Sequence, residues 1–139
     1  MARFHGLALT LFFVTSAAQA ASTDSLPTGV LLDTTTTTAG QTIILPNPVN
    51  VHAAVFVDPP GWHSEWHRHH YPRYVYVIEG SLTVEDEDGG KSTIPAGHVS
   101  IEMLEKWHRG TNPGPGPVKF LVIDQTPPGF GPNMEMKKP

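Results

Sequence analysis

The chain has 139 residues, of which 39% are hydrophobic and 16% charged, and its formal net charge at pH 7 is −4. This length favours one compact domain over two, and the composition excludes a disordered acidic or basic tail. The negative charge argues against a nucleic-acid partner. The 14 prolines and 13 glycines are spread along the chain and leave little room for long helices. Together these features predict a small, turn-rich, all-β domain.

Residues 1–20 have the features of a signal peptide. Arg3 and His5 form a short basic start, residues 7–14 are an apolar run, and Ala18-Gln19-Ala20 is a typical cleavage site. Eight apolar residues are too few to cross a bilayer core, which needs about 20. We expect cleavage after Ala20 and no membrane anchor afterwards. The alternative is a buried N-terminal strand or helix.

The sequence contains no cysteine, so an exported form of this protein cannot be held together by disulfides. Stability must then come from a hydrophobic core, to which a bound metal could add. Export without disulfides favours a bacterial protein that is periplasmic or secreted.

The mature chain divides into three parts by composition. Residues 21–40 are polar and rich in threonine, which predicts a flexible lead-in or an edge strand. Residues 41–125 alternate short apolar runs with turn signals, and residues 126–139 return to proline, glycine and lysine, as in a loose tail. Seven short strands are expected in the middle part, at residues 42–45, 51–57, 74–78, 81–84, 91–94, 99–103 and 118–123.

Two turns between these strands are short enough for hairpins. Glu79-Gly80 separates the runs 74–78 and 81–84, and Gly89-Gly90 separates the next pair of runs. Residues 74–78 are apolar on both faces, as in a strand covered on both sides. The predicted fold is therefore a small β barrel or jelly roll.

Four of the eight histidines lie between residues 63 and 70. On a strand, His67 and His69 point to the same face, because side chains alternate with a period of two. Two imidazoles on one face can bind one metal ion through their neutral ring nitrogens. A third ligand must come from elsewhere, and His108 follows the strand expected at residues 99–103. A solvated histidine-rich loop is the alternative explanation of the cluster.

The spacing around these histidines resembles the two motifs of the cupin superfamily, G-x5-H-x-H-x3-E-x6-G and G-x5-P-x-G-x2-H-x3-N. Seven positions agree: Gly61, His67, His69, Gly80, Gly97, His108 and Asn112. Three positions differ. Arg73 replaces the glutamate of the first motif, and Met103 and Glu105 replace the proline and the second glycine of the second motif. The last two changes are expected to alter only the shape of the loop before His108.

The resemblance, to small single-domain cupins of type 2, implies a double-stranded β-helix barrel with a divalent metal at its mouth. His67, His69 and His108 would be ligands, and the metal could be Fe, Mn, Zn, Ni or Cu. The missing glutamate leaves three alternatives: a three-histidine site with open water positions, a replacement fourth ligand, or a pocket without metal. The candidates for a fourth ligand are Glu65, His63, His70 and Glu102. For Glu102, an outward-facing charge is the favoured expectation.

Three further residues are candidates for substrate binding. Arg73 follows Pro72 and is either a solvated surface charge or a partner for an anionic group of a ligand. Trp66 and Trp107 flank the histidines and are expected to pack in the core or at the rim, with substrate stacking as the alternative.

The sequence therefore predicts an exported cupin that binds a divalent metal and a small-molecule ligand or substrate. One hypothesis is an enzyme, of a dioxygenase or isomerase type. The other is a non-catalytic protein that binds a metal or a small ligand. A homodimer is expected only by analogy with other cupins.

Overall fold

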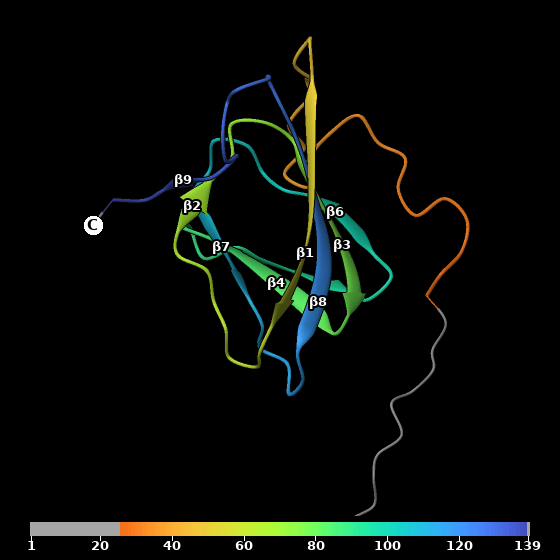
Figure 1. Ribbon diagram of the computed structural model, residues 1–139. Helices are drawn as coiled ribbons and strands as arrows, with labels where there is room; N and C mark the ends of the chain where they lie inside the picture. The colour runs from red at the N-terminus through yellow and green to blue at the C-terminus, as the bar shows by residue number, and fades with distance from the viewer. Residues whose placement is uncertain (1–25, 139) are drawn as a thin grey trace, which may run out of the picture.

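The computed structural model describes residues 26–138, so the expected signal peptide and its cleavage site lie outside the described residues. The described chain forms two antiparallel sheets that face each other (Figure 1). Its strands are β1 (Asn50–Asp58), β2 (His67–Arg68), β3 (Arg73–Glu79), β4 (Ser81–Asp86), β5 (Lys91–Pro95), β6 (Val99–Ile101), β7 (His108–Thr111), β8 (Val118–Thr126) and β9 (Glu135–Met136). Among residues 26–138 there is no helix with the length and hydropathy needed to span a membrane.

The two sheets enclose a core of aliphatic and aromatic side chains. One sheet has the strand order β1-β8-β3-β6 and the other β5-β4-β7-β2-β9. In β8, every second residue is buried from Val118 to Thr126, as expected for a strand with one face on the core. The core is built from Val75, Val77, Leu82, Val84, Ile94, Val118, Phe120 and Val122. The prediction of an all-β jelly roll is therefore confirmed.

Six of the seven predicted strands are present, and the one expected at residues 42–45 is not. There, only Thr42 pairs, in an isolated bridge with Thr36. Ile44 and Leu45 are 75% and 47% exposed, so their apolar side chains do not reach the core. Without a buried face and with two prolines immediately following, this run has little to hold it in a sheet.

The hairpin predicted at Gly89-Gly90 is confirmed, but the one predicted at Glu79-Gly80 is wrong. β4 pairs with β5, whereas β3 and β4 belong to different sheets. Gly80 connects the two sheets with a φ of +74°, and a Cβ there would lie 2.7 Å from the carbonyl oxygen of Pro117. Only glycine fits this crossing between the layers.

The segments on either side of the barrel are packed more closely than the sequence predicted. In the threonine-rich lead-in, Thr37 is buried and Thr38 Oγ1 lies 2.8 Å from Ser100 Oγ of the edge strand β6. In the segment predicted to be a loose tail, β9 pairs with β2. Both contacts rest on polar side chains and backbone groups, which produce no hydrophobic periodicity.

Candidate metal centre

His67, His69 and His108 come together at one end of the barrel, as the sequence predicted. β2 pairs with β7 in a register that places His67 directly opposite His108, and His69 forms a bridge with Leu104. The centroids of the three rings are 4.7–5.0 Å apart. All three residues are buried. Strand alternation thus supplies two imidazoles and strand pairing brings the third.

Backbone carbonyls fix the tautomer of all three rings. The Nδ1 atom of His67 lies 2.8 Å from the Glu65 carbonyl, that of His108 lies 2.8 Å from the Lys106 carbonyl, and that of His69 contacts the Asn133 carbonyl. A carbonyl can only accept, so each Nδ1 carries the hydrogen and donates it. In the neutral rings the Nε2 atoms are therefore left as acceptors. Those of His69 and His108 are buried and have no hydrogen-bond partner in the protein.

Glu102 completes the cluster, and the expectation that it faces outward is wrong. It is 8% exposed, and its Oε2 lies 2.7 Å from His69 Nε2 and 3.8 Å from His108 Nε2. Each of the four residues offers one potential metal-ligand atom, and these four atoms all lie within 4.8 Å of one another. His69 Nε2 and Glu102 Oε2 are both acceptors, so at 2.7 Å they repel each other unless a proton or a metal cation lies between them. The arrangement could hold a metal ion.

The position of Glu102 compensates for the arginine at the glutamate position of the first motif. Glu102 directly follows β6, and its N–H donates to the carbonyl of Arg73 on the neighbouring strand β3 at 2.9 Å. The carboxylate therefore comes from the adjacent strand, at the same level of the sheet. Of the three alternatives left by the sequence, this geometry favours a replacement fourth ligand.

Burial and mutual contact set the pKa values in the cluster. Burial lowers the pKa of His67 to about 4. For His108, burial also acts to lower the pKa, but contact with Glu102 outweighs burial and the pKa is raised. Burial acts to raise the pKa of Glu102, yet contacts with His108 and His69 hold it well below its usual range. Glu102 is thus an anion among imidazoles, a set of groups for which protons and a metal cation compete.

Arg73 is neither a solvated charge nor directed at the cluster as a free cation. Its side chain is 13% exposed, and its Nε and Nη2 each donate to Asp124 across 2.8 Å. Asp124 occupies an inward position of β8, where it is buried. This two-point ion pair neutralises the arginine beside the His-Glu cluster.

The C-terminal segment supports the cluster through the buried Asn133. Its side-chain Nδ2 donates to the Tyr71 carbonyl and to Asp124 Oδ1, and its Oδ1 accepts from the Tyr71 N–H. Its own backbone carbonyl accepts from His69. One residue therefore joins a candidate ligand to the ion pair of Arg73, a role that the sequence did not reveal.

Glu105 retains the conformation of the glycine that it replaces in the second motif. Its φ is +58°, in the left-handed region that glycine favours, so the backbone at this position is glycine-like although the residue is glutamate. The N–H of Glu105 donates to the His69 carbonyl at 2.9 Å, and its carboxylate lies 2.8 Å from His70 Nδ1. These contacts hold the strained backbone in place.

The other candidate ligands lie away from the cluster. Glu65 and His63 are exposed. His70 contacts Glu105 and, through Nε2 at 3.0 Å, Glu135 of β9. These three residues are therefore not brought to the cluster, and Glu102 is the one candidate that is.

The two tryptophans proposed for substrate binding face arginines. The Arg109 guanidinium lies 5.0 Å from the Trp66 ring, and that of Arg68 lies 4.8 Å from the Trp107 ring. Such contacts are typical of rim packing. It is Trp62 that lines the cavity next to the cluster.

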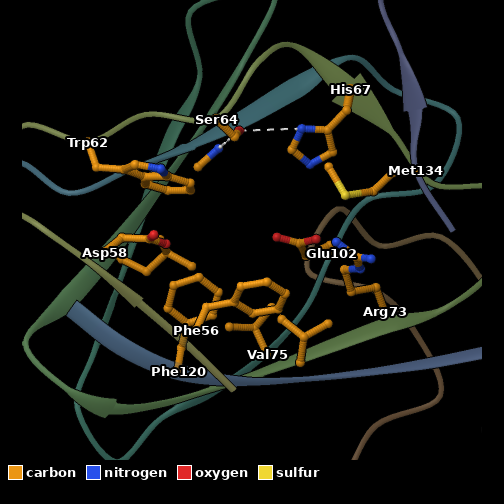
Figure 2. Close-up of a pocket in the computed structure, with 13 residues that line it drawn as sticks. Phe56, Asp58, Trp62, Ser64, His67, Arg73, Val75, Glu102, Phe120 and Met134 are labelled. Carbon is orange, nitrogen blue, oxygen red and sulfur yellow. Dashed lines mark hydrogen bonds between the residues drawn. The ribbon is translucent and has the colours of Figure 1, made fainter. Parts of the chain in front are cut away.

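This cavity has a volume of about 140 Å³ and opens beside His67 and Glu102 (Figure 2). Its apolar walls are Phe56, Trp62, Val75, Leu82, Phe120 and Val122. Met134 of the C-terminal segment and Asp58 at the end of β1 also line it. Sequence reasoning missed both, because Asp58 belongs to the turn signal Asp58-Pro59-Pro60-Gly61 and Met134 lies in the aperiodic tail.

The sequence profile described as "Cupin domain" matches residues 54–124, which are 71 of the 139 residues. The chain belongs to the cupin family. A search of curated protein sequences gives no significant match.

Solved structures agree with the fold of this cupin. An uncharacterised conserved protein from Klebsiella pneumoniae, with a double-stranded β-helix domain, matches with a TM-score of 0.53 and 21% identity, over 70% of this chain and 81% of its own. A DMSP lyase from Ruegeria pomeroyi matches with a TM-score of 0.52 and 16% identity, over 63% of this chain and 43% of its own. This cupin thus spans less than half of the lyase chain. At such identities the likeness shows the fold alone.

Proposed function

We propose that this cupin is a metal-dependent protein in which His67, His69, His108 and Glu102 hold one divalent ion. The observation that carries the proposal is the pair of buried, unpartnered Nε2 atoms of His69 and His108, which face a buried carboxylate. Unpartnered acceptors in a protein interior are costly, and a cation bound between them removes that cost.

The chemistry of the donor set fits such an ion. Three neutral imidazoles and one carboxylate carry a charge of −1, so a divalent ion would leave the site with a charge of +1. Nitrogen and oxygen donors of this kind suit Fe, Mn, Zn, Ni or Cu. When bound, the ion supplies Lewis-acid catalysis by polarising a ligand oxygen.

The cavity beside the cluster supports a small-molecule substrate. Its walls are mainly aromatic and aliphatic and lie beside His67 and Glu102, and such apolar sites with a few polar groups are typical of ligand pockets. We infer an enzyme of an oxygenase or isomerase type. The DMSP lyase of similar fold is a precedent for catalysis on this scaffold but not for the substrate.

Metal content tests the first part of the proposal. The full chain, purified without a histidine tag, should contain close to one divalent ion by elemental analysis. His67→Ala, His69→Ala and His108→Ala should each lose it, whereas the exposed control His98→Ala should keep it. Unchanged metal content in the double variant of His67 and His108 would rule out the site.

Turnover tests the second part. The metal-loaded chain should convert members of a panel of small carbonyl, hydroxy and amino compounds, with oxygen consumption monitored in parallel. The alternative is a non-catalytic cupin that holds a metal or small ligand in the same apolar cavity. Ligand binding without turnover, over the whole panel, would support that alternative.

We propose further that the protein is exported to the periplasm or secreted, on the basis of residues 1–20. Intact mass of the protein from its native host should correspond to a chain that begins at Ala21. Recovery of a species with Met1 intact would contradict export.

A homodimer is proposed from the edge strand β1. Val51, Val55 and Val57 on this strand are 58%, 55% and 61% exposed, and an apolar edge of this kind favours pairing with another strand. Light scattering should give twice the mass of one chain for the wild type and the mass of a single chain for Val55→Lys. A wild-type monomer would rule this out.

A further inference from the structure

The end of the cavity away from the histidines carries a carboxylate that the metal centre does not use. Asp58 is the last residue of β1, and its side chain projects into the cavity from the wall opposite Glu102 (Figure 2). Its Oδ2 atom is buried and has no hydrogen-bond partner. Among the described residues, no lysine, arginine or histidine nitrogen lies within ion-pair distance of it.

The backbone that carries Asp58 is held in place. Asp58 pairs with Val118 at the end of the β1–β8 ladder. Its carbonyl accepts a hydrogen bond of 3.1 Å from Nδ2 of the fully buried Asn112. The carboxylate is therefore presented to the cavity by a rigid backbone, and its lack of partners does not come from disorder of the strand end.

The surroundings of Asp58 favour a cation as its partner. Burial raises the pKa of its carboxyl, which reflects the cost of an unpaired charge here. Phe56, Trp62 and Phe120 line the same cavity, and aromatic faces attract ammonium groups. The one arginine on the cavity wall, Arg73, is already paired with Asp124. No group within residues 26–138 supplies the missing positive charge.

We propose that Asp58 binds the ammonium group of a small amine whose apolar part occupies this cavity. A cavity of about 150 Å³ accommodates a benzene ring, so a volume of about 140 Å³ suits a ligand with one ring or a short alkyl chain. This inference rests on the proposed function, because it assigns a class of ligand to the cavity beside the metal centre. The amine would lie between Asp58 and the His-Glu cluster.

Binding of matched probes to the full chain tests the proposal. Benzylamine and its neutral analogue benzyl alcohol are titrated into metal-free and zinc-loaded protein, with affinity measured by NMR shift changes at the Trp62 indole. Benzylamine should bind at least tenfold more tightly than benzyl alcohol. Asp58→Asn should remove that preference, whereas the exposed control Asp33→Asn should retain it. A preference of less than twofold, or one that survives Asp58→Asn, would overturn the proposal.

Two further measurements separate the possible failures. Asp58→Asn and Asp58→Ser should both fold and melt at or above the wild-type temperature, because each removes a half-buried charge whose Oδ2 has no partner. Unfolding of both variants would assign Asp58 a structural role and overturn the proposal. Metal content is measured on the same samples. Metal binding without amine preference refutes this inference alone, whereas amine preference without metal binding supports it and refutes the proposed metal centre.

Discussion

The apolar interior and the His-Glu cluster lie in the same barrel but are held by different means. The interior is carried by long strands, β3 and β8, whose side chains alternate between the core and the outside. The cluster is carried by β2, with two residues, and β7, with four. Strands this short fix few side chains by pairing alone, so backbone carbonyls hold each imidazole through Nδ1. The interior thus determines stability, and local hydrogen bonds determine the geometry of the cluster.

Truncation in the interior should give the largest effect on stability. Leu82 is 3% exposed and packs in the core, so Leu82→Ala should lower the free energy of unfolding by about 2–5 kcal/mol. Denaturant unfolding of the metal-free chain measures this. The folded fraction should still bind one metal ion per chain. Loss of metal from folded Leu82→Ala would show that the two regions are coupled and not separately held.

The reverse experiment changes the cluster and spares the interior. Glu102→Gln removes the only carboxylate of the cluster and should weaken divalent-metal binding by about 100-fold, which corresponds to about 2.7 kcal/mol. Competition with a chelator measures the affinity. Glu105→Gln is the matched control, because Glu105 is in the same loop and its side chain is 56% exposed. Equal affinities for the two variants would remove Glu102 from the metal centre.

Asn133 joins the two regions, so its removal should affect both. Asn133→Ala leaves the backbone groups of Tyr71 and one oxygen of Asp124 without this partner, which should cost about 1–3 kcal/mol of stability. It should also loosen the segment that holds His69 and weaken metal binding about tenfold, as is typical when support of a ligand is lost. Unfolding and chelator competition measure the two effects. An effect on stability with unchanged metal affinity would limit Asn133 to packing.

The pH dependence of stability tests the burial of His67. Burial lowers the pKa of His67 to about 4, below the unfolded value of 6.5. The unfolded chain therefore binds more protons between pH 6.5 and 4, and this contribution to stability is lost as the pH falls through that range. His67→Gln should flatten this part of the curve in metal-free protein. An unchanged slope would mean that another group determines it.

The sequence predicted the fold and, through strand alternation and the motif spacing, the three histidines of the cluster. Apolar runs between turn signals are sufficient to place six strands, and alternation places His67 and His69 on one face. Position 102 lies just beyond β6, where strand alternation no longer determines which way a side chain points. The inward orientation of Glu102 therefore could not be predicted from the sequence. Asn133 acts through hydrogen bonds with residues 62 and 64 positions earlier in the chain, and hydrophobic periodicity carries no trace of such contacts.

The contact between His69 and Asn133 also determines the order in which parts of the cluster can form during translation. The two residues are 64 positions apart, and at about 5–20 residues per second the ribosome adds the second about 3–13 s after the first. Once residue 108 has been added, every candidate metal ligand has been synthesised, but His69 still lacks the Asn133 carbonyl that fixes its tautomer. A barrel can therefore begin to assemble before the candidate metal centre is complete, and the arrangement of this centre depends on a residue translated after all four of its candidate ligands.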